Sequence, residues 1–456
     1  MGSRICLFAV LAWTLTGGAW AGEPPAEETA ILARVVPPKF PDKDFPITAY
    51  GAVAEGDASP AIAKAIAACA EAGGGRVVVP AGRWRTGGIR LASNVNLHVA
   101  EGATLVFDPD PKRYLPVVTT HWEGMECRNY AALIYAAGET NVAVTGGGTL
   151  DGSATWDTWW AWCNKADKTK GPVRQKADRD KLVEMVAAGT PPDQRVFGDG
   201  HFLRPNFIQP YRCTNVLIEG ITLLNSPMWE VHPVLCTNVT VRKVTAKTLG
   251  PNNDGCNPES CRDVLIEDCL FETGDDCIAI KSGRNNDGRR IGVPSENIVI
   301  RRCSFKDGHG GVTLGSEISG GVRNVFVSDC RMDSPELDRA FRFKSNAVRG
   351  GVLENVRIRD VQIGQVGKEV LCVEFDYEEG PTGEHHPVLR GVTIERVTAE
   401  QSGQAIAIRP IPNSSVEDIV IRDCTFRGTT APPDLRGGDV RLIGVTIERA
   451  KDSTGR

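Results

Sequence analysis

The chain has 456 residues, of which 41% are hydrophobic and 24% are charged, and its formal net charge is −5. This composition is ordinary for a soluble protein with a large core, although the length alone allows more than one domain. The weak negative charge, without a polybasic tail, excludes a general attraction to nucleic acid, and we expect no nucleic-acid partner.

Residues 1–21 have the pattern of a signal peptide. Arg4 is the only early charge, an apolar run covers residues 5–15, and small residues precede a cleavage point near Ala21. The run is too short to span a bilayer, which needs about 20 residues. We therefore expect export to the periplasm or the outside, and no membrane partner. The alternative is a buried N-terminal helix.

The mature chain is expected to begin with a linker over residues 22–40 and to continue as one catalytic domain over residues 41–456. Within that domain, Ser59–Gly73 combines Ser-Pro, an Ala/Ile-rich run and a glycine stop, which predicts a helix. Gly73–Trp84 predicts a turn and the first strand. A solenoid must cover its open apolar end, so we expect a short N-terminal capping helix.

A repeated pattern follows in the second half of the chain. Each copy begins with a short polar residue or glycine, has aliphatic residues at positions +1 and +3, and has a small apolar residue at +6. Eight copies start at Asn215, Asn238, Asp263, Asn297, Asn324, Asn355, Gly391 and Asp418, and weaker ones start at Asn94 and Asn141.

The repeat predicts the fold class. Alternation at period two indicates a strand, and a repeat of a few tens of residues indicates a solenoid or a propeller. Several copies follow one another too closely for a propeller blade, which needs about 40–45 residues. The sequence therefore predicts an all-β, single-domain, right-handed parallel β-helix.

Cysteines share the buried +6 position with aliphatic residues. The eight copies place there Ile221, Val244, Cys269, Cys303, Cys330, Val361, Val397 and Cys424. Cysteine that alternates with valine and isoleucine behaves as a small hydrophobe. Disulfides between Cys256 and Cys261, or between Cys127 and Cys163, stay open.

Unusual polar residues recur at similar distances from the starts of four successive copies. They are Asp254, the pair Asp275 and Asp276, His309, and the pair Arg342 and Lys344. Because stacked strands are about 4.8 Å apart, these side chains should meet on one face. The sequence predicts a cleft with three carboxylates, one imidazole and two cations. The alternative is a set of polar turns.

That cleft indicates glycoside hydrolysis. Three close carboxylates cannot all be ionised, so one should have a raised pKa and act as an acid while its neighbours activate water. Arg342 and Lys344 suit the carboxylate of an anionic sugar, which a guanidinium can bind with two hydrogen bonds.

Four motifs, "NNDG", "GDDCIAIKSG", "GHGGVTLGSE" and "RFKS", resemble in this order those of the polygalacturonase family of pectin-degrading hydrolases, glycoside hydrolase family 28. The resemblance covers nearly the whole mature chain and implies the pectin-lyase-like type of β-helix. Asn253 and Phe343 depart mildly from the usual threonine and isoleucine, and Asn257 replaces a common aspartate.

The resemblance implies an inverting hydrolysis of α-1,4-galacturonosyl linkages in pectin or polygalacturonate, with no metal or other cofactor. Asp275 would be the general acid, Asp254 and Asp276 would share the base role, and His309 would adjust Asp275. An acid and base about 6.5–9.5 Å apart are expected for inversion. The substrate-binding residues implied are Asn252, Lys281, Arg342, Lys344, His232 and Tyr377.

The insertion at residues 153–182 carries four tryptophans and seven Lys/Arg, and residues 198–213 and 226–236 resemble bacterial exo-acting members. The insertion could close one end of the cleft or stack on sugars, or it could simply pack its own tryptophans. We expect exo action on a pectic polysaccharide or an oligogalacturonide by a monomer. Alternatives are a rhamnogalacturonan or xylogalacturonan hydrolase, a calcium-dependent pectate lyase, and a β-helical binding protein.

Overall fold

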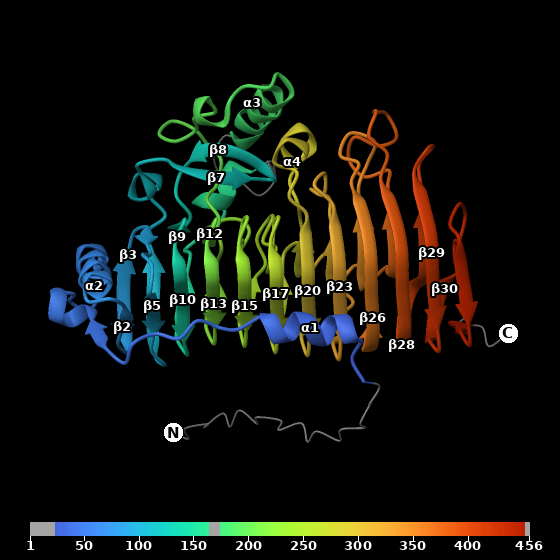
Figure 1. Ribbon diagram of the computed structural model, residues 1–456, viewed down its shortest axis with the longest axis horizontal. Helices are drawn as coiled ribbons and strands as arrows, with labels where there is room; N and C mark the ends of the chain where they lie inside the picture. The colour runs from blue at the N-terminus through green and yellow to red at the C-terminus, as the bar shows by residue number, and fades with distance from the viewer. Residues whose placement is uncertain (1–22, 164–173, 452–456) are drawn as a thin grey trace, which may run out of the picture.

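The computed structural model describes residues 23–163 and 174–451, which form one elongated parallel β-helix (Figure 1). Each coil contributes short strands to three stacks that run along the long axis. The predicted right-handed parallel β-helix is confirmed. All neighbours within the stacks are parallel, and the pair β7 (Val118–Trp122) and β8 (Met125–Asn129) is an antiparallel hairpin outside them.

The first stack carries the repeat. Its strands are β1 (Asp44–Pro46), β2 (Gly75–Val79), β5 (Val95–Val99), β10 (Thr140–Gly146), β13 (Thr214–Glu219), β15 (Thr237–Arg242), β17 (Arg262–Glu267), β20 (Ser295–Arg301), β23 (Val322–Ser328), β26 (Val352–Gln365), β28 (Val388–Arg409), β29 (Ser415–Arg422) and β31 (Val440–Ile443). The register pairs the +1 residues with one another, as in Val216 with Val239 and Val239 with Val264.

The second stack follows directly after the +6 position. Its strands are β3 (Gly82–Thr86), β6 (Ala103–Phe107), β11 (Thr149–Asp151), β14 (Thr222–Leu224), β16 (Thr245–Thr248), β18 (Leu270–Thr273), β21 (Ser304–Phe305), β24 (Arg331–Met332), the later parts of β26 and β28, β30 (Thr425–Ala431) and β32 (Thr446–Arg449).

The third stack carries the unusual polar residues. Its strands are β4 (Ile89–Arg90), β9 (Ile134–Ala137), β12 (Ile208–Tyr211), β19 (Ile278–Ile280), β22 (Val312–Leu314), β25 (Phe341–Lys344) and β27 (Glu369–Glu374). Single bridges through Val231 and Cys256 carry the stack from β12 to β19.

An asparagine ladder explains the polar first position of the repeat. Asn215, Asn238 and Asn297 have positive φ angles of 58, 58 and 59°, a left-handed conformation in which Asn and Asp are enriched. The amide of each can then donate to the residue one coil earlier, as Asn238 does to Asn215 at 2.7 Å. One residue thus serves the turn and the stack together.

Buried thiols fill the interior as expected. The thirteen cysteines of the described residues are buried, and Cys269, Cys303 and Cys330 follow one another at the +6 position. The two disulfides that stayed open do not form, because Cys127, Cys256 and Cys261 are free thiols.

Two helices cover apolar surfaces of the solenoid. Helix α2 (Ser59–Glu71) lies over its N-terminal end and buries Ile62, Ile66 and Cys69, which confirms the capping helix (Figure 1). Residues 22–40 are not a plain linker, because α1 (Ala26–Arg34) packs Ile31 along the outside of β17 and β20. Leu265 and Val299, which are apolar residues on the outer face of those strands, pack against α1.

Further helical segments lie beside the third stack, above the strands in Figure 1. They include α3 (Gln175–Ala187) and α4 (Asn285–Ile291). Short 3-10 turns are η1 (Ile47–Tyr50), η2 (Pro111–Tyr114), η3 (Trp159–Trp162) and η4 (Pro192–Gln194). No helix among the described residues is long and apolar enough to cross a membrane.

Candidate active site

The third stack brings the predicted carboxylates together. One oxygen from each of Asp254, Asp275 and Asp276 lies within 4.8 Å of the others. Asp254 belongs to the coil before Asp275 and Asp276, and the backbone amide of Gly255 donates to the carbonyl of Asp276. The cluster is tighter than the separation of about 6.5–9.5 Å that we expected for an inverting pair.

Asp254 holds the extra proton of this cluster. Burial and the charge of Asp275 raise the pKa of Asp254, Lys281 at 3.6 Å lowers it, and the result is a pKa of about 8. The amide of Asn257 donates to Asp254 at 2.8 Å. The expectation that mutual repulsion protonates Asp275 is therefore wrong for the free protein.

His309 explains why Asp275 differs. Burial would raise the pKa of Asp275, but the hydrogen bond with His309 and the charges of His309, Lys344 and Lys281 hold it well below the usual range. His309 Nδ1 is 3.0 Å from Asp275 Oδ1. The same hydrogen bond raises the pKa of His309, which favours an imidazolium beside the Asp275 carboxylate.

The two predicted cations lie two coils further along, on β25. Lys344 Nζ donates to Asp276 Oδ2 at 2.6 Å, and Arg342 is 3.8 Å from the same carboxylate while donating to Glu374 at 2.7 Å. Both cations face the ring of Tyr377, at 5.1 and 5.4 Å from its centroid. The structure thus brings Tyr377 to the same pocket as the carboxylates.

Of the other expected binding residues, Asn252 and Lys281 line the pocket. Lys281 donates to Glu317 at 3.0 Å and lies 4.3 Å from the ring centroid of Trp229. His232 does not reach the pocket, because it is 0% exposed.

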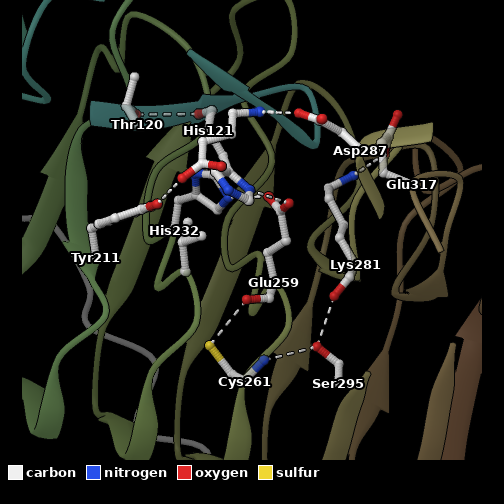
Figure 2. Close-up of polar contacts among 12 residues, drawn as sticks. Thr120, His121, Tyr211, His232, Glu259, Cys261, Lys281, Asp287, Ser295 and Glu317 are labelled. Atoms are coloured by element: carbon white, nitrogen blue, oxygen red, sulfur yellow. Dashed lines mark hydrogen bonds and ion pairs between the residues drawn. The ribbon is translucent and has the colours of Figure 1, made fainter. Parts of the chain in front are cut away.

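Figure 2 shows His232 and His121 next to the carboxylate of Glu259, which they contact at 2.8 and 2.7 Å. These contacts hold the pKa of Glu259 down at about 2 against the effect of burial. His121 comes from the hairpin strand β7, so the network joins that hairpin to the floor of the site. The expectation of a substrate contact for His232 is corrected to this supporting place.

A network of ion pairs walls the pocket on the side of the hairpin. Glu123, in the turn between β7 and β8, pairs with Arg179 of α3 at 2.6 Å and with Arg284 at 2.9 Å. Arg179 and Arg284 also reach Glu378, at 3.5 and 3.3 Å. Glu123, Arg179 and Glu378 line the pocket, so segments far apart in sequence close it together.

Sequence reasoning missed this wall. Glu123 and Glu378 lie at no repeat position, and the hairpin carrying Glu123 was not expected. The one available signal was the insertion at residues 153–182, which contains Arg179 and the first part of α3.

The tryptophans of the insertion mainly pack on the protein. Trp159 is buried against Tyr114 and Trp162, with ring centroids 5.6 and 4.8 Å apart. Trp160 donates to the carbonyl of Ser226 at 2.8 Å and lies against Gly250. Several of its Lys/Arg residues lie outside the described residues.

The carboxylate cluster has the spacing of a metal site, but its surroundings do not fit one. Lys281 and Lys344 already contact Asp254 and Asp276, at 3.6 and 2.6 Å. A calcium ion would lie beside two ammonium groups and be repelled by them. The residues present suit proton transfer better than calcium binding.

A parallel β-helix that gathers three carboxylates, an imidazole and two cations on one stack fits a glycoside hydrolase of the β-helical class, and the family match shows that class. The chain belongs to family 28, described as "Glycosyl hydrolases family 28", whose sequence profile matches residues 199–434.

Relatives agree with this assignment. A "Probable polygalacturonase" of Vitis vinifera is 30% identical over 369 residues, covering 78% of this chain and 67% of that protein. An "Exo-poly-alpha-D-galacturonosidase" of Dickeya chrysanthemi is 25% identical over 399 residues, covering 82% and 65%. The chain therefore spans about two thirds of the length of these two relatives.

One solved structure is similar over nearly its whole length. The hyperthermoactive exopolygalacturonase from Thermotoga maritima is 44% identical, with a TM-score of 0.89, and the alignment covers 93% of this chain and 95% of that one.

Proposed function

We propose that this protein hydrolyses α-1,4-galacturonosyl linkages in polygalacturonate or its oligomers and attacks from a chain end. The observation that carries the proposal is the cluster of Asp254, Asp275 and Asp276 beside Arg342 and Lys344, next to a pocket lined by Glu123, Arg179 and Glu378. Similarity to the Thermotoga exopolygalacturonase supports exo action. A walled pocket accepts a terminal sugar more readily than the middle of a polymer.

In this proposal the proton shared by His309 and Asp275 reaches the glycosidic oxygen through Asp275 as the bond to the anomeric carbon breaks. Water attacks that carbon from the opposite face, and its proton passes to Asp276, with Asp254 helping to hold the water. Arg342 and Lys344 bind the galacturonate carboxylate, and Tyr377 contacts the ring. The expected outcome is inversion at the anomeric carbon.

The boundaries of the mature protein are part of the proposal. Residues 1–21 would be removed as a signal peptide, and the exported protein would act as a monomer on pectic substrates. The catalytic unit covers residues 41–456, and α1 adds a packed segment to it.

Product analysis tests the proposed function. Polygalacturonate is digested with and without EDTA, early products are sized, and their anomers are followed by proton NMR. Hydrolysis from the end predicts a small saturated product from the first minutes, unaffected by EDTA, with the inverted anomer. A ladder of oligomers would contradict exo action, and unsaturated, EDTA-sensitive products would instead identify a pectate lyase.

A further inference from the structure

A long groove lies on the outer face of the first stack, whereas the catalytic carboxylates lie beside the third. It has a volume of about 720 Å³ and lies between the segment that joins α1 to β1 and the strands β2, β5, β10, β13 and β15. Figure 1 shows this segment running across the lower parts of the strands of the first stack. Five stacked strands about 4.8 Å apart make the groove about 19 Å long. An extended chain therefore fits the groove better than a single sugar does.

The outer face of the first stack changes character along the molecule. Beneath α1 it is apolar, because Leu265, Val299 and Phe326 follow one another in register and pack against that helix. Further along the same row, the groove presents Arg76 and Asn96. The part of this face that the helix covers is thus apolar, and the part that lines the groove is polar. A polar lining suits a polar ligand rather than another segment of protein.

Asn96 brings an unused donor to the groove. The residue is only 7% exposed, and its Oδ1 accepts from Thr145 Oγ1 at 2.8 Å. Because the single hydroxyl hydrogen of Thr145 is used in this bond, His98 Nδ1, at 3.1 Å, donates to Thr145 Oγ1. No hydrogen bond from Asn96 Nδ2 to another described residue is found, although nearly buried amides usually have their partners. The groove therefore offers N–H groups to the oxygen atoms of a ligand.

Positive charge is in excess in the groove. Its cationic side chains of lysine and arginine are Lys39, Arg76, Arg242 and Lys243. Arg76 pairs with Asp44 at 2.7 Å and Arg242 with Glu219 at 2.8 Å. Lys39 and Lys243 are exposed and make no ion pair with another described residue. In a chain with a net charge of −5, this local group of cations attracts an anionic ligand.

We propose that this groove is a second, non-catalytic binding site for an extended polyuronate chain. The two unpaired lysines bind carboxylates of the polymer, and the polar row of Asn96, Thr145 and His98 binds its hydroxyl groups. The groove holds the protein on the polymer while the pocket beside the third stack acts on a chain end. The inference rests on the proposed function and places a further site on a different face of the solenoid.

The double variant Lys39→Glu with Lys243→Glu tests the groove. Binding of fluorescently labelled polygalacturonate is measured in the Asp275→Asn background, with saturating trigalacturonate present so that the pocket is occupied. The Kd for the polymer should rise about tenfold, because two attractive contacts become repulsive. In the active protein, kcat/KM for polygalacturonate should fall about threefold, while kcat/KM for trigalacturonate should stay the same.

A second groove variant, Asn96→Asp, keeps the oxygen that accepts from Thr145 and replaces the N–H donor with a carboxylate oxygen. It should weaken polymer binding in the same assay. The matched control is Lys64→Glu with Lys112→Glu, which changes the net charge as the lysine double variant does. Both control lysines are exposed and lie outside the groove and the pocket, so polymer binding should not change. Polyglutamate, a polyanion without sugar rings, should bind the parent protein more weakly than polygalacturonate does.

Four results would overturn the inference: no polymer binding by the parent once trigalacturonate is present, an unchanged Kd in either groove variant, an equal loss in the control, or polyglutamate binding as tight as that of polygalacturonate. The last two would show general electrostatic attraction only. A wild-type protein that cleaves no galacturonan would contradict the proposed function, and the binding assay would still report on the groove. Cleavage of trigalacturonate together with unchanged polymer binding in the groove variants would contradict this inference alone.

Discussion

At the residue scale, the neighbouring residues Asp275 and Asp276 have identical side chains but different hydrogen-bond partners. Asp275 shares a proton with His309 at 3.0 Å, whereas Asp276 accepts from Lys344 and Thr313 at 2.6 and 3.0 Å. Their neighbour Asp254 meets a different environment again and holds a proton of its own. The three aspartates therefore have three different sets of neighbours.

The acid role of Asp275 can be tested directly. Asp275→Asn should lower kcat by about 10²–10⁴-fold, because an amide cannot deliver a proton to the leaving oxygen. Binding of an oligogalacturonate, followed by calorimetry, should change little. Asp193→Asn, an exposed aspartate outside the pocket, is the matched control. Substantial turnover by Asp275→Asn would rule out the assignment.

The proton on Asp254 has a consequence for stability. Since its pKa in the folded protein is about 8, above its unfolded value, folding retains a proton that the unfolded chain releases above about pH 4. This contribution to stability is present below about pH 4 and decreases as the pH rises toward 8.

Asp254→Asn removes the loss of stability that the wild type undergoes as the pH rises toward 8. The variant should therefore melt higher than the wild type at pH 7 and close to it at pH 4, while losing about 100-fold or more in kcat. Thermal unfolding at the two pH values, with activity measured in parallel, checks both parts. A lower melting temperature at pH 7 would show that Asp254 is ionised in the folded protein.

At the scale of elements, the strands that carry the site also carry the fold. β19, β22 and β25 stack in register, which fixes the spacing of the side chains that flank them. The hairpin β7–β8 and helix α3 are additions outside the stacks. The floor of the pocket therefore depends on the repeat, and its wall depends on these additions.

Arg179→Ala tests the role of the wall. The substitution removes the contacts of α3 with Glu123 and Glu378 and should loosen the closed end of the pocket. We expect a larger share of longer oligomers among the early products, measured by chromatography, with the melting temperature nearly unchanged because the side chain is at the surface of the wall. Lys176→Ala, on the same helix, should leave the product pattern as it is, because the one ion pair of Lys176 within residues 23–163 and 174–451 is with Asp180. An unchanged pattern in both variants would mean that the wall does not set exo action.

At the scale of the whole molecule, the solenoid is held together by stacked side chains rather than by covalent links. The cysteines of the described residues are buried, those at the +6 position of the repeat are free thiols, and the asparagine ladder joins successive coils. Burial raises the pKa of Cys256 and of Cys277, which disfavours the reactive thiolate.

The melting temperature should therefore be the same with and without dithiothreitol, and a thiol titration of the native protein should find almost no reactive cysteine. After unfolding, the titration should find all of them. A drop in the melting temperature on reduction would reveal a disulfide and contradict the free thiols.

Much of the fold and of the site followed from the sequence because the repeat reports on neighbours in space. Val216, Val239 and Val264 occupy the same position in successive copies, and they are partners in the stack. The same periodicity brought His309 close to Asp275 and Lys344 close to Asp276. In a solenoid, residues at similar positions of successive repeats lie side by side on neighbouring coils. The buried thiols followed for the same reason, whereas the capping helix followed from local helix signals in Ser59–Gly73 and from the open end of a solenoid.

Only the tertiary structure decided the rest, because those features depend on segments with no periodic relation. The wall needs Glu123, Arg179 and Glu378 from three separate segments of the chain. The spacing of the motifs along the chain likewise could not decide which aspartate is protonated. The pKa of each carboxylate depends on its burial and on its partners, and these raise the pKa of Asp254 and lower that of Asp275. The sequence by itself determined which residues share a face, and the three-dimensional environment determined what each of them can do there.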